Sequence, residues 1–207
     1  ITLAAVLLGI VIGTLVAIIR STWDQNADRM RPGAGKTLLH IGDILCKIYL
    51  TVIRGTPVVV QLMIMFYIIF ATSRNGVGVA MLAFGVNSGA YVAELIRGGI
   101  GAVDRGQMEA GRSLGMSRLQ AMRKVVFPQA VKNILPALCN EFISTVKGTS
   151  LASVFFVGEL MTSFKTVQSA TFLALQSLTI VGIIYFLLNF ILSRLLRVIE
   201  RRLIVSD

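Results

Sequence analysis

Four stretches of this chain contain no Asp, Glu, Lys or Arg over a length that matches a lipid bilayer. They cover residues 1–19, 55–73, 75–93 and 166–193. An α-helix rises 1.5 Å per residue, so about 20 apolar residues cross the hydrocarbon core of a membrane. A fifth stretch is apolar apart from one acidic residue, Glu141. The pattern predicts an all-α integral membrane protein with about five transmembrane helices.

The expected spans form one transmembrane domain over residues 1–207. We place them at about residues 1–19, 55–73, 75–96, 130–147 and 168–193. Only 14% of the residues are charged and 55% are hydrophobic. About a quarter of the residues of a soluble domain are charged, so the composition excludes an ordinary soluble enzyme.

The positive charges indicate an orientation in the membrane. Of the 20 Lys and Arg residues, six lie between Arg20 and Arg54, seven between Arg97 and Lys132, and four after Ser193. Basic residues stay on the cytoplasmic side of a membrane, which predicts the N-terminus outside and the C-terminus in the cytoplasm. No basic stripe alternates with aromatic residues, so the net charge of +10 does not indicate a nucleic-acid partner.

Two segments between the spans have patterns of their own. Residues 21–36 are polar and predict a loop. Over residues 36–54 the polar residues recur at steps of three or four, which predicts an amphipathic helix at the membrane surface. The polar residues of this face are Lys36, His40, Asp43, Lys47, Thr51 and Arg54.

Cofactor chemistry has little support in the sequence. His40 is the one histidine, and the two cysteines, Cys46 and Cys139, lie far apart, so no metal site is expected. Gly35-Lys36-Thr37 matches the end of a phosphate-binding loop, but Met30 stands where that pattern requires glycine. We therefore expect this chain to bind no nucleotide.

Residues 104–128 are rich in helix formers but too polar to enter a membrane. Gly115 can end one helix in the left-handed conformation. Ser117 and Gln120 have the spacing of a capping box, which begins another helix. The segment predicts two short cytoplasmic helices joined by a tight glycine corner.

The same segment resembles the EAA loop of bacterial ABC importer permeases. Glu109-Ala110-Gly111, then Gly115, then Val125-Val126-Phe127-Pro128 follow the order of that motif, with Gly111, Val125 and Phe127 as departures. In the family this loop is a coupling helix that docks on a cytoplasmic ATPase. The resemblance implies a coupling role for Glu109, Ala110, Gly111, Arg112, Gly115 and Pro128.

Further motifs resemble the polar amino acid branch of this family, over roughly residues 38 to 205. They are Arg54-Gly55-Thr56-Pro57, Val60-Gln61, Ala90-Tyr91-Val92-Ala93-Glu94, Arg97-Gly98-Gly99-Ile100, Asn140-Glu141-Phe142-Ile143 and Lys147-Gly148-Thr149-Ser150-Leu151. The resemblance implies a type I ABC importer permease core in a bacterial plasma (inner) membrane. It also implies a dimeric cytoplasmic ATPase that uses ATP and Mg, a second permease subunit and an extracytoplasmic amino acid-binding protein.

Charged and polar residues within the expected spans are candidates for the substrate pathway. Charges inside spans are costly and usually face a protein interior or an aqueous path. A zwitterionic amino acid needs a group that recognises its carboxylate and one that recognises its ammonium. The candidates are Arg54, Gln61, Asn87, Tyr91, Glu94, Arg97, Asn140, Glu141, Lys147, Thr149 and Ser150.

Two questions stay open at this level. The charges, above all Arg54 and Arg97, could instead form pairs between helices that only fix the packing. A cationic substrate would require Glu94 or Glu141 to be unpaired, whereas a neutral one would require them paired.

We expect no catalysis by this chain itself. The alternative function is a stand-alone amino acid permease driven by an ion gradient. Such carriers commonly show inverted repeats, and none is evident here.

Overall fold

The computed structural model describes residues 1–27, 30 and 33–204, and all regular structure in these residues is helical. The long helices are α1 (Thr2–Asn26), α2 (Ala34–Gly55), α4 (Gly76–Gly101), α7 (Phe127–Gly148) and α9 (Ala174–Ile204). The short ones are α3 (Val58–Ile64), α5 (Arg105–Ser113), α6 (Arg118–Ala121) and α8 (Leu160–Thr171). Met65–Ile69 and Met122–Val126 are π-helical, and Thr149–Phe155 is a 3₁₀ helix.

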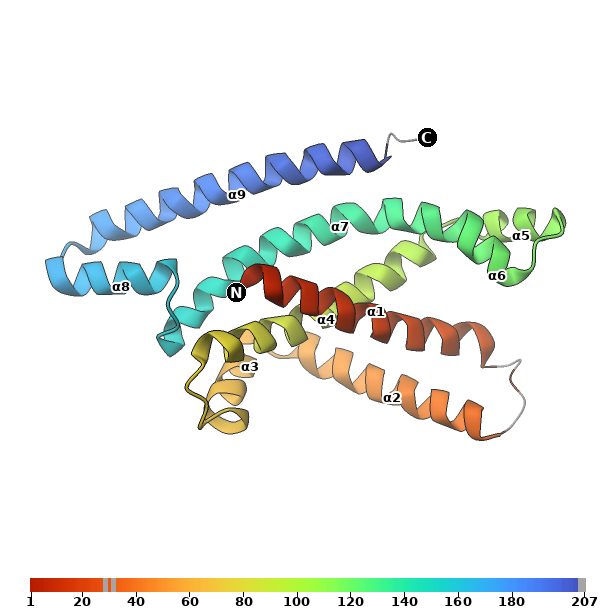
Figure 1. Cartoon of the computed structure of the whole chain (residues 1–207), viewed down its shortest axis with the longest axis horizontal. Coiled ribbons are helices and arrows are strands. Elements are labelled where there is room, and N and C mark those ends of the chain that lie inside the picture. The colour runs from red at the N-terminus through yellow and green to blue at the C-terminus, as the bar shows by residue number, and fades with distance from the viewer. Residues whose placement is uncertain (28–29, 31–32, 205–207) are drawn as a thin grey trace.

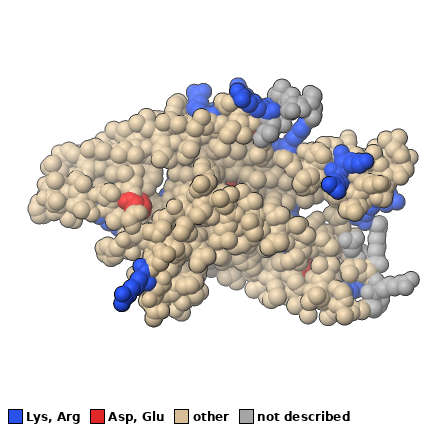
Figure 2. Space-filling view, in the orientation of Figure 1, with Lys and Arg blue, Asp and Glu red and all other residues tan. Residues whose placement is uncertain are grey.

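The long helices run roughly along the long axis of the molecule (Figure 1). The end of α1, the start of α2, the α5–α6 pair and the end of α9 lie toward one end, and α8 lies toward the other (Figure 1). On the face shown in Figure 2, Lys and Arg gather mainly toward the end with α5, α6 and the C-terminal part of α9. This is the distribution that the predicted cytoplasmic end requires.

Among the residues that the structure describes, three single helices are long and apolar enough to cross a membrane. They are Thr2–Gln25, Gly76–Gly101 and Ala174–Arg202. A fourth span is possible if α2 and Val58–Ile69 together make one span bent by 111°. The expected all-α membrane protein is therefore confirmed, while the count of five spans and the orientation stay predictions.

The span expected at residues 55–73 is not one continuous helix in the structure. Helix α2 ends at Gly55, and Thr56 is extended with φ −119° and ψ 147°. Pro57 follows, and a residue before proline is forced out of the helical conformation. The chain turns by 111°, and its helical structure ends at Ile69.

Two other expected boundaries also differ from the structure. The span expected at 168–193 begins later, because Phe172 adopts a left-handed φ of 58° and α9 starts at Ala174. Helix α1 continues to Asn26 and so occupies the first part of the loop expected at 21–36. Residues 28–29 and 31–32 of that loop lie outside the described residues.

Helices α1 and α4 form the most extensive contact between two helices of the described structure, and glycines lie in this contact. Each helix carries two glycines four residues apart: Gly9 and Gly13 in α1, and Gly85 and Gly89 in α4. A Cβ placed on Gly13 would lie 2.7 Å from the Cβ of Val92. Small residues at this spacing let two helix backbones approach within direct packing distance.

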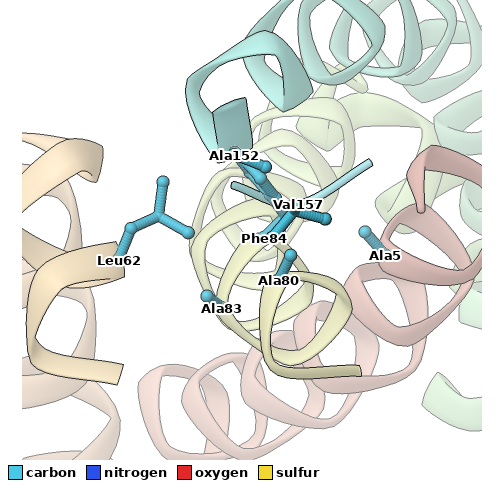
Figure 3. Close-up of a cluster of buried hydrophobic side chains, with 7 residues drawn as sticks. All are labelled: Ala5, Leu62, Ala80, Ala83, Phe84, Ala152 and Val157. Carbon is cyan, nitrogen blue, oxygen red and sulfur yellow. The ribbon is translucent and has the colours of Figure 1, made fainter. Parts of the chain in front are cut away.

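Two apolar clusters extend this pair to the rest of the bundle. Near the N-terminus, α1, α3 and α4 meet the segment that follows α7 (Figure 3). The buried members are Ala5, Leu62, Ala80, Ala83, Phe84, Ala152 and Val157. At the other end, Val103, Val126, Ala130 and Ile134 pack α7 against the end of α4. A Cβ on Gly99 would overlap the side chain of Ile134, so α4 and α7 pack in close contact at this point.

Helix α2 turns part of its polar face inward, which corrects the expected surface helix. Asp43 is 0% exposed. Its Oδ2 lies 2.6 Å from Lys47 Nζ, and its Oδ1 accepts a hydrogen bond from Arg20 Nε at 3.3 Å. The exposed residues of α2 include the apolar Leu38, Ile41, Ile44, Leu45, Ile48 and Val52. An apolar outer face over buried charges suits contact with lipid.

We expect Gly13→Val to loosen the α1–α4 pair. The added methyl groups would enter the space that Val92 occupies, and overpacking of this kind costs about 1–3 kcal/mol. Thermal unfolding of the purified chain, followed by size-exclusion chromatography, measures the effect. Gly98→Val is the control, because nothing lies within 4 Å of a Cβ at Gly98. Equal melting temperatures for the two variants would contradict the packing role.

We expect Asp43→Asn to destabilise the fold more than Asp24→Asn. The first change leaves Arg20 and Lys47 without their buried carboxylate, and breaking a buried pair costs roughly 3–5 kcal/mol. Asp24 is the matched control because its side chain is 43% exposed, and exposed pairs contribute only about 0–1 kcal/mol. The same melting assay ranks the two variants, and the reverse order would exclude a structural role for the buried carboxylate.

Candidate functional site

A cavity of about 380 Å³ opens beside the start of α3, between α4 and α7. Its walls are Thr56, Pro57, Val58, Phe84, Asn87, Tyr91, Glu141, Ser144, Thr145 and Gly148. Asn87, Tyr91 and Glu141 are three of the predicted pathway residues, and the structure brings them together. The bend after Gly55 places Thr56 and Pro57 in the wall. Sequence reasoning missed Ser144 and Thr145, although both follow Glu141 on the same face of α7.

Glu141 is the charged group of this cavity. Ser88 donates a hydrogen bond to its Oε1 at 2.9 Å. Thr145 donates to the Glu141 carbonyl oxygen at 3.0 Å and lies 3.5 Å from Oε1. Among the described residues no Lys, Arg or His forms an ion pair with this carboxylate. A carboxylate inside an apolar bundle without an ionic partner is a candidate ligand contact.

Asn87 is held in place by Gln61 of α3. The Asn87 Nδ2 donates to Gln61 Oε1 at 2.9 Å. The Gln61 Nε2 lies within donating distance of Ile53 O at 2.7 Å, Thr56 O at 3.1 Å and Thr56 Oγ1 at 2.9 Å. Gln61 therefore ties the end of α2 to the cavity wall.

Glu94 and Arg97 do not line the cavity. Glu94 accepts from Arg97 Nη1 at 3.2 Å, and it lies 3.5 Å from Arg54 Nη1 and 3.7 Å from Arg20 Nη1. Arg97 Nη2 also donates to Asp24 at 3.0 Å. These pairs join α1, α2 and α4, so the geometry favours a packing role for Arg54 and Arg97. Glu94 belongs to the same ion pairs, so the geometry favours a packing role for it as well. Sequence reasoning missed Arg20 and Asp24, whose spacing of four puts both on one face of α1.

Arg54 connects this charge network to the cavity. Its guanidinium carbon lies 5.9 Å from the centre of the Tyr91 ring, which lines the cavity. Placed over a ring face, a guanidinium is attracted by the quadrupole of the ring. Arg54 therefore contacts both Glu94 of the ion pairs and the Tyr91 ring of the cavity wall.

The remaining predicted pathway residues lie apart from the cavity wall. Asn140 and Lys147 are exposed on α7. Thr149 is buried and donates to Val146 O at 2.8 Å, and Ser150 donates to Lys147 O at 2.7 Å. Their roles in a pathway stay predictions.

The segment 104–128 forms the expected helical corner. Gly115 adopts a φ of 83° after α5. Ser117 and Gln120 form both hydrogen bonds of the predicted capping box at the start of α6. Gly111 is buried, and a Cβ there would lie 3.1 Å from the Ala121 Cβ, so the two helices pack closely. Glu109, Ala110, Arg112 and Pro128 are exposed.

This corner also exposes two apolar side chains that the sequence reading did not single out. Leu114 is 80% exposed and Leu119 is 77% exposed. Both flank Gly115 at the end of the molecule that carries α5 and α6 (Figure 1). Exposed apolar groups rimmed by Glu109 and Arg112 are typical of a protein contact. Among the described residues no group of three or more His, Cys, Asp or Glu could hold a metal ion.

Comparison with known proteins gives the chain a family. Residues 38–205 match the model of the binding-protein-dependent transport system inner membrane component. The arginine transport system permease protein ArtQ of Bacillus subtilis is 35% identical, over 100% of this chain and 91% of that protein. The putative glutamine transport system permease protein GlnP of Rickettsia bellii is 34% identical, over 98% of this chain and 87% of that protein.

Solved structures agree with this match. A chain of a crystal structure described as an amino acid ABC transporter with histidines is 37% identical, with a TM-score of 0.84, and the match covers 97% of this chain and 88% of that one. An inward-facing MetNI methionine ABC transporter, at 20% identity and a TM-score of 0.72, shares the fold over 98% of this chain and 90% of that one. The chain belongs to the inner membrane components of binding-protein-dependent transport systems, the permease subunits of ABC importers.

Proposed function

We propose that this chain forms the translocation pathway for a polar or charged amino acid in an ATP-driven importer of a bacterial plasma membrane. The observation that carries the proposal is the cavity beside Glu141, a polar site with a carboxylate that has no ionic partner in the described structure. A carboxylate there accepts hydrogen bonds from the ammonium group of an amino acid. The names of the relatives, which transport arginine and glutamine, support this substrate class.

The α5–α6 corner is the proposed docking surface for the ATPase. The exposed Leu114 and Leu119 supply apolar contact area, and the flanking charges of Glu109 and Arg112 fix its orientation. The polypeptide continues from α6 through the π-helical Met122–Val126 into α7 without a loop. Because α7 carries Glu141, a displacement of the docked corner reaches the cavity wall through one continuous helical segment.

The partners follow from the proposed role. A dimeric cytoplasmic ATPase hydrolyses ATP with Mg, and this chain converts the resulting motion into transport without catalysing a reaction. A second permease subunit, the same chain or a similar one, completes the membrane part. An extracytoplasmic binding protein delivers the amino acid at the opposite end from the α5–α6 corner.

The alternative, a carrier driven by an ion gradient, has less support. Such a carrier has no use for an exposed helical corner that projects from the bundle. Purified chain in vesicles distinguishes the two functions: we expect no uptake with an ion gradient alone, and uptake only when the ATPase, the binding protein and ATP are present. Uptake by the chain alone would establish the carrier.

We expect Leu114→Asp combined with Leu119→Asp to abolish association with the ATPase. Two carboxylates would replace the apolar contact area and would have to be desolvated on docking. The measurement is the ATPase-to-permease ratio after tagged purification in mild detergent. Thr37→Asp is the control, because it adds a charge at an exposed position in the first turn of α2. An unchanged ratio for the double variant would remove the corner from the docking surface.

We expect Glu141→Leu to reduce ATP-driven uptake roughly tenfold or more, because a hydrogen bond to a charged group contributes about 1.5–3 kcal/mol. The assay is initial uptake of a labelled amino acid into proteoliposomes that contain the whole importer. Val131→Leu is the control, since its side chain is 41% exposed on α7 and lies outside the cavity wall. Equal losses in both variants would indicate damage to α7 rather than loss of a substrate contact.

A further inference from the structure

A second cavity, of about 470 Å³, opens where the end of α1 meets the end of α4 and the start of α5. It lies toward the end of the molecule that carries α5 and α6, which is the predicted cytoplasmic end (Figure 1). The proposed transport function assigns no role to it. Its walls are Ser21, Asp24, Gln25, Arg97, Ile100, Gly101, Val103 and Arg105.

The lining of this cavity is positively charged. Its charged side chains are the guanidinium groups of Arg97 and Arg105 and the carboxylate of Asp24, so the lining residues carry a formal charge of +1. Asp24 is already engaged, because its Oδ2 accepts a hydrogen bond from Arg97 Nη2 at 3.0 Å. Arg97 also donates from Nη1 to Glu94 at 3.2 Å. A guanidinium has more N–H donors than these contacts use, so donors of Arg97 remain for a ligand.

Arg105 is the cation that gives the cavity its excess charge. It is exposed at the first position of α5, and it forms no ion pair with any residue that the structure describes. Ser21 adds a hydroxyl group, whose oxygen accepts a hydrogen bond from Gln25 Nε2 at 3.0 Å. A hydroxyl that accepts can still donate its own proton. A phosphate group satisfies such a set of donors, because guanidinium groups bind its oxygens through charge-assisted hydrogen bonds.

An exposed apolar stripe on α1 leads to this cavity. Its members follow one another at steps of three or four residues, and all are at least 56% exposed: Leu3, Leu7, Val11, Leu15 and Ile18. The same steps from Ile18 reach Ser21 and then Gln25, which are both in the cavity wall. Residues at this spacing lie on one face of a helix. One face of α1 is therefore apolar along most of its length and ends at a cationic cavity.

We propose that this cavity binds the headgroup of an anionic phospholipid of the inner leaflet, with an acyl chain along the apolar stripe of α1. A phospholipid is the ligand that uses both features, because its phosphate requires cationic donors and its acyl chain requires an adjoining apolar surface. Basic pockets between transmembrane helices on the cytoplasmic side are typical sites for anionic lipid headgroups. A free phosphate would use the cavity and leave the stripe without a role.

The site connects the membrane surface to the coupling corner. Arg105 begins α5, and α5 ends at Ser113, beside the exposed Leu114. A phosphate held by Arg97 and Arg105 joins the end of α4 to the start of α5. This binding does not depend on which substrate the importer carries, so it stands or falls separately from the proposed function.

The test is lipid binding to the permease–ATPase complex, purified in mild detergent and titrated with one lipid at a time. Native mass spectrometry counts the lipids bound to each complex. The probes are dioleoyl-phosphatidylglycerol, which is anionic, and dioleoyl-phosphatidylethanolamine, a zwitterion with the same acyl chains. We expect the anionic lipid to bind about fivefold more tightly or better, since each basic residue near the surface favours it by roughly that factor. Equal affinities would overturn the proposal.

Two variants should move the affinity for phosphatidylglycerol in opposite directions. Arg105→Gln reduces the formal charge of the lining to zero and should lower the affinity about fivefold. Asp24→Asn removes the one negative charge of the lining and should raise the affinity, an effect that misfolding does not produce. An unchanged affinity in both variants would exclude the cavity as the lipid site.

Arg201→Gln is the matched control, because it removes the same charge at an exposed position of α9 outside the cavity wall. Equal losses in Arg105→Gln and Arg201→Gln would indicate diffuse attraction of the basic end for anionic lipid and would overturn a discrete site. Displacement of phosphatidylglycerol by millimolar inorganic phosphate would identify free phosphate as the occupant and reject the lipid. A lower ATPase-to-permease ratio in Arg105→Gln, with lipid binding unchanged, would assign Arg105 to the protein contact instead.

Discussion

The close packing of α1 against α4 at their glycines is the constraint on which the rest of this bundle depends. Without Cβ atoms at Gly9, Gly13, Gly85 and Gly89, the two backbones pack against each other along their lengths. In a membrane, helix association comes mainly from close packing and interhelical polar contacts, since lipid is as apolar as the helix surface. Helices α2, α3 and α7 pack directly against this pair, which is therefore the frame of the subunit.

The α1–α4 pair separates charged groups that form ion pairs from a carboxylate that forms none in the described structure. On its α2 side Arg20 pairs with both Asp43 and Glu94, and these pairs join three helices. Glu141 lies on the α7 side without such a partner in the described residues. The charges on the α2 side are thus paired, and the carboxylate beside the cavity is left without an ion pair. Arg54 and Tyr91 stand at the boundary between the two regions.

The sequence predicts where helices form better than it predicts which side of each helix is buried. The left-handed Gly115 and the Ser117 capping box depend on local chemistry, so both were predictable. The helix over 36–54 was also evident, but burial of Asp43 was not, because its partner Arg20 comes from another helix. The span over residues 55–73 was predicted only from the length of its uncharged stretch, which does not reveal the bend at Pro57. Grouping of Asn87 with Glu141 requires the packing of α4 on α7, which no single segment encodes.

The contact between Gly99 and Ile134 has a mechanical consequence. Ile134 lies midway between Phe127, the first residue of α7, and Glu141 in the cavity wall. At 1.5 Å per residue each arm is about 10 Å long. A rigid helix that tilts about such a point would move its two ends in opposite directions, so an inward displacement at Phe127 would give an outward displacement of similar size at Glu141. Under the proposed docking of the ATPase, the displacement of the α5–α6 corner would then be passed to this wall of the cavity inverted and almost unamplified.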